Sequence, residues 1–224
     1  MASQNERFNR IINQANITII GNNNHISMYC DSEDSAEELL TGAGFLLIVK
    51  GDGNEVDMGT VIVRCSSILG MTGLKLIIGQ LPGLGAGVSR TANGCSVTIG
   101  DRVVINGVTL YLQEDHSRVS IGDDSQLSWG VDVWCTDAHT ITDLEGNPVN
   151  YAESIEIGRH VWVGKDVKIG KNVRIADNSI VGWGSIVTKR FDEPNVILAG
   201  TPAKIVKRGI NWDRKCINKY TKGL

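Results

Sequence analysis

The stretch IGRHVWVGKDVKIGKNVRIADNSIVGWGSIV, from Ile157 to Val187, repeats a pattern every six residues. Ile or Val stands at each sixth position, and the residue that follows it is small. The repeated positions are Ile157, Val163, Ile169, Ile175, Val181 and Val187. A period of six does not match the helical turn of 3.6 residues, but an even period places side chains on one side of extended backbone. A fixed repeat of six predicts a parallel β-helix, in which successive coils stack on one another.

Crowding explains this form of repeat. Each short strand places one aliphatic side chain inside a narrow core, and the next coil places another directly over it, at a spacing of about 4.8 Å. The following position lies near a corner, where Gly lets the chain bend. We therefore expect a prism with stacks of Ile and Val along its core.

The regular repeat extends from about residue 97 to residue 208. Earlier repeat positions are held by Ile99, Ile105, Ile121, Leu127 and Val133. Ile105 and Ile121 are 16 residues apart, two fewer than a coil of three hexads. The difference predicts a shortened corner at about 114–117.

A second interruption lies between Val133 and Ile157. After the hexad that begins at Val133, residues 139–156 are left over, and their 143–148 segment (DLEGNP) is rich in turn-forming residues. We expect a loop extruded from one corner at about 137–156. Loops held by a rigid scaffold are frequent places for function.

The chain is expected to form one continuous, mainly β domain. It has irregular N-terminal coils and a cap at 1–96, the regular β-helix at 97–208 and a tail at 209–224. Further strands are expected at 45–50, 60–65 and 74–78, and short terminal helices at 1–16 and 211–222. Residues 32–40 suit either a helix or a loop.

Composition excludes some functions. The net charge is −3 and no basic block is present, which argues against nucleic-acid binding. The five Cys residues form no CxxC pair, which is typical of reduced thiols in a cytoplasmic protein. No signal-peptide pattern is visible, and the longest apolar run, 44–49, is too short to span a membrane. We expect a soluble cytoplasmic protein.

His139, at the entrance to the extruded loop, is the candidate general base, because imidazole titrates near neutral pH. An ordinary surface histidine is the open alternative. Asp137 is two residues earlier, so on extended backbone it would share a side with His139 and orient the imidazole. A corner Asp bonded to its own backbone is equally compatible with the sequence.

Two rival candidates lie near His139 in the sequence. Cys135 is a candidate nucleophile, but a free Cys in a strand is more often a small buried hydrophobe. His160 is a second candidate base, expected within a strand beside Trp162.

Four segments then carry a specific resemblance: 137–141 (DAHTI), 157–165 (IGRHVWVGK), 181–189 (VGWGSIVTK) and 199–204 (AGTPAK). Together they resemble the hexapeptide-repeat acyltransferases. The closest members are O-acetyltransferases of sugars and bacterial polysaccharides, including polysialic-acid and capsule O-acetyltransferases. The resemblance covers about residues 97–208.

The resemblance implies a left-handed β-helix and a homotrimer with acetyl-CoA bound between subunits, where the acetyl group is transferred directly. His139 matches the catalytic histidine, and Trp162 matches a tryptophan whose indole N–H binds the oxyanion in some members. Contacts to coenzyme A are implied for Lys165, Trp183, Thr188, Lys189, Lys204 and Lys207. Each also has a plainer interpretation: the tryptophans as packing residues, the others as solvent-exposed surface.

The acceptor is not identified by the sequence. Candidate acceptor contacts are Asn106, Asp115, Tyr151 and Glu153. The main prediction is O-acetylation of a sugar or surface polysaccharide, and N-acetylation of a nucleotide-linked amino sugar is the alternative. A zinc enzyme would need His116, His139 and His160 to converge, and a non-catalytic scaffold is a fourth reading. We expect no metal.

Overall fold

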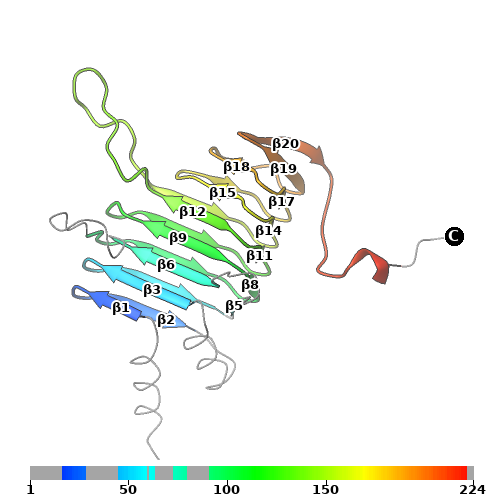
Figure 1. Cartoon of the computed structure of the whole chain (residues 1–224), viewed down its shortest axis with the longest axis horizontal. Coiled ribbons are helices and arrows are strands. Elements are labelled where there is room, and N and C mark those ends of the chain that lie inside the picture. Colours follow the sequence, from blue (N-terminus) through cyan, green and yellow to red (C-terminus); the bar gives the residue numbers. More distant parts are fainter. Residues whose placement is uncertain (1–16, 29–44, 60, 64–72, 80–90, 221–224) are drawn as a thin grey trace, which may run out of the picture.

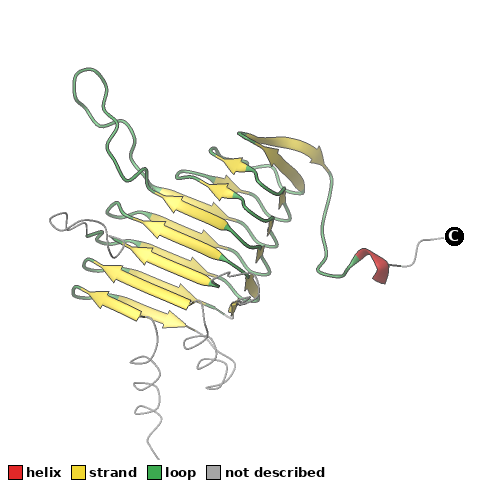
Figure 2. Cartoon of the chain, in the orientation of Figure 1, coloured by secondary structure: helices red, strands yellow, loops and turns green. Residues whose placement is uncertain are grey.

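The computed structural model describes residues 17–28, 45–59, 61–63, 73–79 and 91–220. They form a parallel β-helix in which the chain winds around three flat faces (Figures 1 and 2). On the near face of Figure 1 the strands run from right to left while successive coils climb, so the winding is left-handed. This confirms the predicted fold class.

Each face is one sheet. Sheet A has the order β1 (Ile17–Ile20), β3 (Phe45–Lys50), β6 (Leu74–Ile78), β9 (Val108–Leu112), β12 (Val131–Cys135), β15 (Lys168–Ile169), β18 (Ile186–Val187). Sheet B contains β2 (His25–Met28), β4 (Glu55–Met58), β7 (Ser96–Ile99), β10 (Arg118–Ile121), β13 (Ser154–Ile157) and β16 (Arg174–Ile175). Sheet C contains β5 (Val61–Val63), β8 (Val103–Ile105), β11 (Gln126–Leu127), β14 (Trp162–Val163), β17 (Ile180–Val181), β19 (Val196–Gly200) and β20 (Ala203–Arg208). Among these strands, only β19 and β20 pair antiparallel.

The hexad positions form the core by stacking in register. In sheet A the register aligns Leu47, Leu76, Leu110, Val133, Ile169 and Val187. All six side chains are at most 1% exposed. Each step of six residues moves the chain to the next face, so three hexads complete a coil of 18 residues, as between Ile157 and Ile175.

Earlier coils differ from the hexad ideal. Ile99 pairs with Ile121, which makes that coil 22 residues long. Its strands contain three to five residues, whereas β15 and β18 contain two. The register nevertheless continues through them. The strands predicted at 45–50 and 74–78 are confirmed as β3 and β6, and that at 60–65 corresponds to the shorter β5.

Asp and Asn hold the corners between coils. Asp124, Asp166, Asn172 and Asn178 adopt left-handed backbone, with φ between 57° and 59°. Short polar side chains tolerate this conformation best. Neighbouring corners are also linked by hydrogen bonds, since Asn172 Oδ1 accepts from the Glu153 N–H at 2.8 Å.

The predicted extruded loop is confirmed as a hairpin (Figure 1). It occupies residues 136–153, between β12 and β13, and an antiparallel bridge joins Thr142 to Pro148. The predicted boundary at residue 156 was too late, because 154–157 already pair with β10 as β13. The shortened corner lies at 113–117, as expected.

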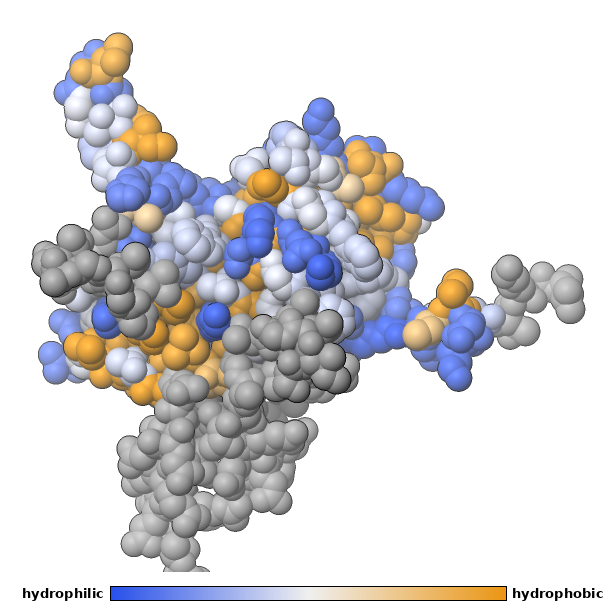
Figure 3. Space-filling model, in the orientation of Figure 1, coloured by the Kyte–Doolittle hydropathy of each residue, from blue (hydrophilic) through white to orange (hydrophobic). Residues whose placement is uncertain are grey.

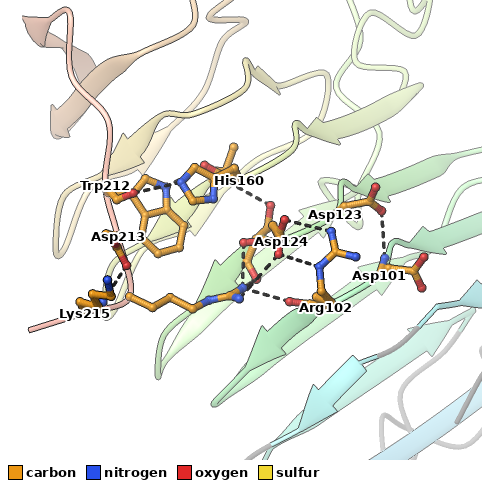
Figure 4. Close-up of polar contacts among 11 residues, drawn as sticks. Asp101, Arg102, Asp123, Asp124, His160, Trp212, Asp213 and Lys215 are labelled. Carbon is orange, nitrogen blue, oxygen red and sulfur yellow. Dashed lines mark hydrogen bonds and ion pairs between the residues drawn. The ribbon is translucent and has the colours of Figure 1, made fainter. Parts of the chain in front are cut away.

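The C-terminal segment is an extended arm in which the expected helix at 211–222 is reduced to one 3₁₀ turn, Ile217–Lys219. The Trp212 ring stacks on the His160 imidazole at 4.4 Å and donates Nε1–H to the His160 carbonyl at 2.7 Å (Figure 4). Arg214 donates to the carbonyls of Arg102 and Asp124. These side chains hold the arm against the prism, so it has no need of helical hydrogen bonds.

The expected helix at 1–16 and the segment at 32–40 lie outside the described residues. Within the described ranges, no helix has the length and apolar character needed to span a bilayer.

Two glycines at equivalent hexad positions test the corner packing. A Cβ on Gly158 would lie 2.3 Å from Asp177 Oδ1 and 2.8 Å from Asp177 N, whereas on Gly170 the nearest atom is Val187 O at 3.7 Å. We expect Gly158→Ala to lower the free energy of unfolding by about 2 kcal/mol or more, and Gly170→Ala to change it by at most about 0.5 kcal/mol. Urea unfolding measures both variants, and equal effects would contradict this account of the corner.

Candidate active site

His139 lies at the neck of the hairpin, where it is exposed and lines a cavity of about 760 Å³. The cavity lies at the corner between sheets A and B. Other lining residues come from the neighbouring corner and from both sides of the hairpin, among them Gln113, Glu114, Asp115, Thr136, Asn150 and Tyr151. The predicted base is therefore placed in a concave site of a size that accepts small ligands.

Glu114 gives this cavity a fixed wall. Its Oε1 accepts from the Thr136 hydroxyl at 3.1 Å, and its Oε2 accepts from the Ala152 N–H at 2.8 Å. The Thr136 hydroxyl also accepts from the Ala138 N–H at 2.8 Å. One carboxylate thus joins the outgoing and returning sides of the hairpin next to His139.

The geometry predicted for Asp137 was wrong. Ala138 has a φ of 61°, so the backbone between Asp137 and His139 is not extended and the two side chains do not share a side. Asp137 instead pairs with Lys171 at 2.5 Å and accepts from Asn150 Nδ2 at 2.8 Å. The Lys171 ammonium, with help from Asn150, lowers the pKa of the Asp137 carboxyl. Among the described residues, no side chain hydrogen-bonds to the His139 imidazole.

The residues implied in coenzyme A binding are distributed over other parts of the prism. Trp162 lies in sheet C, and its buried Nε1 has no hydrogen-bond partner among the described residues. Lys165 and Trp183 lie at the corner between sheets C and A, one coil apart. Lys165 pairs with Asp166 at 2.9 Å, whereas the Trp183 side chain is 75% exposed.

The remaining candidates fall into two groups. Thr188 and Lys189 follow β18, at the same A–B corner as His139 but two coils further along, while Lys204 and Lys207 project from β20. All four are exposed. These positions are open to a ligand, but one chain does not place them around the cavity.

The acceptor candidates also separate. Asp115 and Tyr151 line the cavity with His139. Glu153 is exposed outside that lining, where its carbonyl accepts from the Arg118 N–H. Asn106 is 5% exposed and lies at the corner between sheets C and A. The prediction that Asn106 contacts the acceptor in this cavity was wrong, because the residue is buried at a different corner.

The three histidines proposed as metal ligands do not converge. His160 occupies a corner turn rather than a strand, and Trp212 covers its ring. His116 lies against Gly94 at another corner. Across the described part of the chain, no group of three His, Cys, Asp or Glu side chains is arranged to hold a metal ion.

Similar proteins point to one enzyme family, although no family model matches the chain. A polysialic acid O-acetyltransferase of Neisseria meningitidis is 34% identical over 180 residues, which cover 79% of this chain and 82% of that protein. One of Escherichia coli O1:K1 is 37% identical over 123 residues, 54% of this chain; the chain spans only 39% of that relative's length. The crystal structure of the polySia specific acetyltransferase NeuO aligns with a TM-score of 0.58 at 26% identity, over 91% of this chain and 84% of that one.

The chain belongs to the hexapeptide-repeat acetyltransferases. Its listed homology to two polysialic acid O-acetyltransferases, one of them matched over most of both chains, places it beside those enzymes within the family.

Cys135 does not have the properties of a nucleophile in this acetyltransferase. Its side chain is fully buried, and the thiol contacts the Arg118 carbonyl at 3.7 Å. Burial is the main cause that raises the pKa of the Cys135 thiol to about 12. The reactive form of a cysteine is the thiolate, which is scarce at neutral pH under these conditions. A buried core residue is therefore the better interpretation of Cys135.

Sequence reasoning missed Asn150 and Lys171, which contact the segment around His139. Asn150 donates Nδ2–H to the His139 carbonyl at 2.9 Å, and Lys171 reaches Asp137 from the next coil. Neither residue belongs to a recognised motif. The only available signal was the position of Asn150 near the end of the expected loop.

Thiol labelling tests the assignment of Cys135. We expect the folded acetyltransferase to leave Cys135 unmodified by iodoacetamide at pH 8, while the exposed Cys216 is alkylated. Peptide mass spectrometry before and after unfolding in urea measures both sites. Modification of Cys135 in the folded protein at the rate of Cys216 would contradict its burial.

Proposed function

We propose that this acetyltransferase transfers an acetyl group from acetyl-CoA to a hydroxyl of a bacterial surface polysaccharide. Its named relatives act on polysialic acid, which makes a sialic-acid polymer the first acceptor to test. The observation that carries the proposal is the exposed His139 in a cavity at the neck of the hairpin. Acetyl-CoA is a cytoplasmic metabolite in this proposal, so the reaction belongs in the cytoplasm.

In the proposed mechanism, His139 takes the proton of the acceptor hydroxyl as its oxygen attacks the thioester carbonyl. General-base help of this kind contributes about 10²- to 10⁴-fold. The tetrahedral intermediate collapses with cleavage of the C–S bond, and the imidazolium returns its proton to the thiolate of coenzyme A. No acyl-enzyme is required, which agrees with the buried Cys135.

Trp162 is the proposed oxyanion donor. Its indole N–H is buried without a hydrogen-bond partner among the described residues. A buried unpaired donor has a free-energy cost of about 1–3 kcal/mol, so a function for it is physically reasonable. A donor to the developing oxyanion contributes about 10²- to 10³-fold to the rate.

The positions of the candidates support a homotrimer. His139 lies at the A–B corner, whereas Trp162, Lys165 and Trp183 lie in sheet C or at the C–A corner. A threefold arrangement of prisms would place the A–B corner of one subunit beside sheet C of the next. The hairpin also carries exposed apolar side chains, Ile141 at 56%, Leu144 at 102% and Val149 at 58%, as seen near its tip in Figure 3. Such side chains favour contact with another subunit.

Replacing the proposed base tests the function. We expect His139→Ala to lower kcat by about 10²- to 10⁴-fold, with thiol release from acetyl-CoA as the assay. The acceptor panel holds polysialic acid, a neutral polysaccharide and an amino sugar, so it also separates O-acetylation from N-acetylation. His25→Ala, an exposed histidine in β2, is the matched control and should retain full activity. Activity of His139→Ala within a few-fold of wild type would end the proposal.

Subunit mixing tests the shared site. We expect His139→Ala and Trp162→Phe each to be impaired, and their mixed trimers to regain activity, because one interface then carries an intact His139 and an intact Trp162. Co-expression with two affinity tags isolates the mixed particles, and sedimentation measures the number of chains. An active monomer, or mixed particles as inactive as their parents, would exclude the shared site.

A further inference from the structure

Asn150 closes the neck of the hairpin around His139. Its Nδ2 donates to the His139 carbonyl at 2.9 Å and to Asp137 Oδ2 at 2.8 Å. Its Oδ1 accepts from the Ile141 N–H at 2.8 Å. One carboxamide therefore binds backbone or side chain at positions 137, 139 and 141, so it fixes the backbone on both sides of the candidate base.

Lys171 ties this neck to the solenoid. It lies at the A–B corner of the next coil, between β15 and β16. Its ammonium pairs with Asp137 at 2.5 Å and donates to the Asn150 carbonyl. The Lys171 side chain is only 16% exposed. The hairpin neck is thus attached to a rigid corner through a charged group rather than through apolar packing.

The Lys171–Asp137 contact keeps its charges over the working range of an enzyme. Lys171 lowers the pKa of Asp137. A carboxyl with a lowered folded-state pKa stabilises the fold above its unfolded value of about 3.9 and loses this contribution as the pH falls below it. The clamp is therefore intact at neutral pH.

We propose that Asn150 and Lys171 are positioning residues that place His139 for catalysis. The inference rests on the proposed function, since it assigns a role to residues that act through His139. The imidazole itself has no hydrogen-bond partner among the described side chains, so the placement of its backbone determines where the base can reach. A misplacement of about 1 Å can cost about 10²-fold in rate.

Asn147 offers a matched control in the same hairpin. Its N–H donates to Asp143 Oδ1 at 2.7 Å and its Nδ2 donates to Asp143 Oδ2 at 3.0 Å, far along the hairpin from His139. It is the same residue type, and its side chain also bonds within the hairpin. Removing it loosens the tip without changing a printed contact of the neck.

The experiment compares Asn150→Ala with Asn147→Ala in the full-length enzyme. We expect Asn150→Ala to lower kcat by about 10- to 100-fold, to leave KM for acetyl-CoA within about twofold, and to leave the melting temperature near that of Asn147→Ala. Asn147→Ala should keep wild-type kcat. Lys171→Met should lower kcat by a smaller factor, and Lys171→Arg should restore most of it, which provides a second test if Asn150→Ala does not fold.

Combining each change with His139→Ala separates positioning from acceptor binding. We expect Asn150→Ala to have no further effect on kcat once His139 is absent. The inference is overturned if the loss is the same with and without His139, if Asn147→Ala is equally impaired, or if Asn150→Ala and Lys171→Met both keep wild-type kcat. These failures differ from failure of the proposed function, which appears as full activity in His139→Ala alone.

Discussion

The structure depends on the stacking of one aliphatic side chain over another along the axis of the prism. Leu110, Val133 and Ile169 occupy successive levels of one such stack, each fully or almost fully buried. Because each residue in a stack has neighbours directly above and below, size and shape are constrained at every level. Backbone hydrogen bonds also run between coils, so the chain has little freedom left at the faces. Variation is confined to the corners, where the hairpin and the candidate site occur.

The fold could be predicted because its period is visible in single residues. The hexad positions from Ile157 to Val187 report directly on the core, and the 18 leftover residues before Ile157 report on the hairpin. The end of the chain could not be predicted in the same way. Trp212 and Arg214 look compatible with a helix by composition, but their partners, His160 and Asp124, are distant in the sequence. Tertiary contacts therefore decided the conformation of that segment.

The candidate site was predictable in its residue types and less so in its geometry. His139 was identified from its place before the loop and from the resemblance, and it does line a cavity. The role of Asp137 depended on extended backbone, and the left-handed conformation of Ala138 removed that condition. Asn150 and Lys171 have no motif of their own. Their importance arises only when the hairpin returns to the prism and the next coil passes beside it.

The C-terminal arm changes how the coils depend on one another. In a solenoid each coil interacts mainly with its nearest neighbours, so the ends can fray one coil at a time. Here the arm leaves the last strands and runs back to Arg102, Asp124 and His160, which belong to three successive coils (Figure 4). Loss of the terminal coil would also release these contacts further down. The arm therefore links levels that are not adjacent and makes the melting of this end of the solenoid more cooperative.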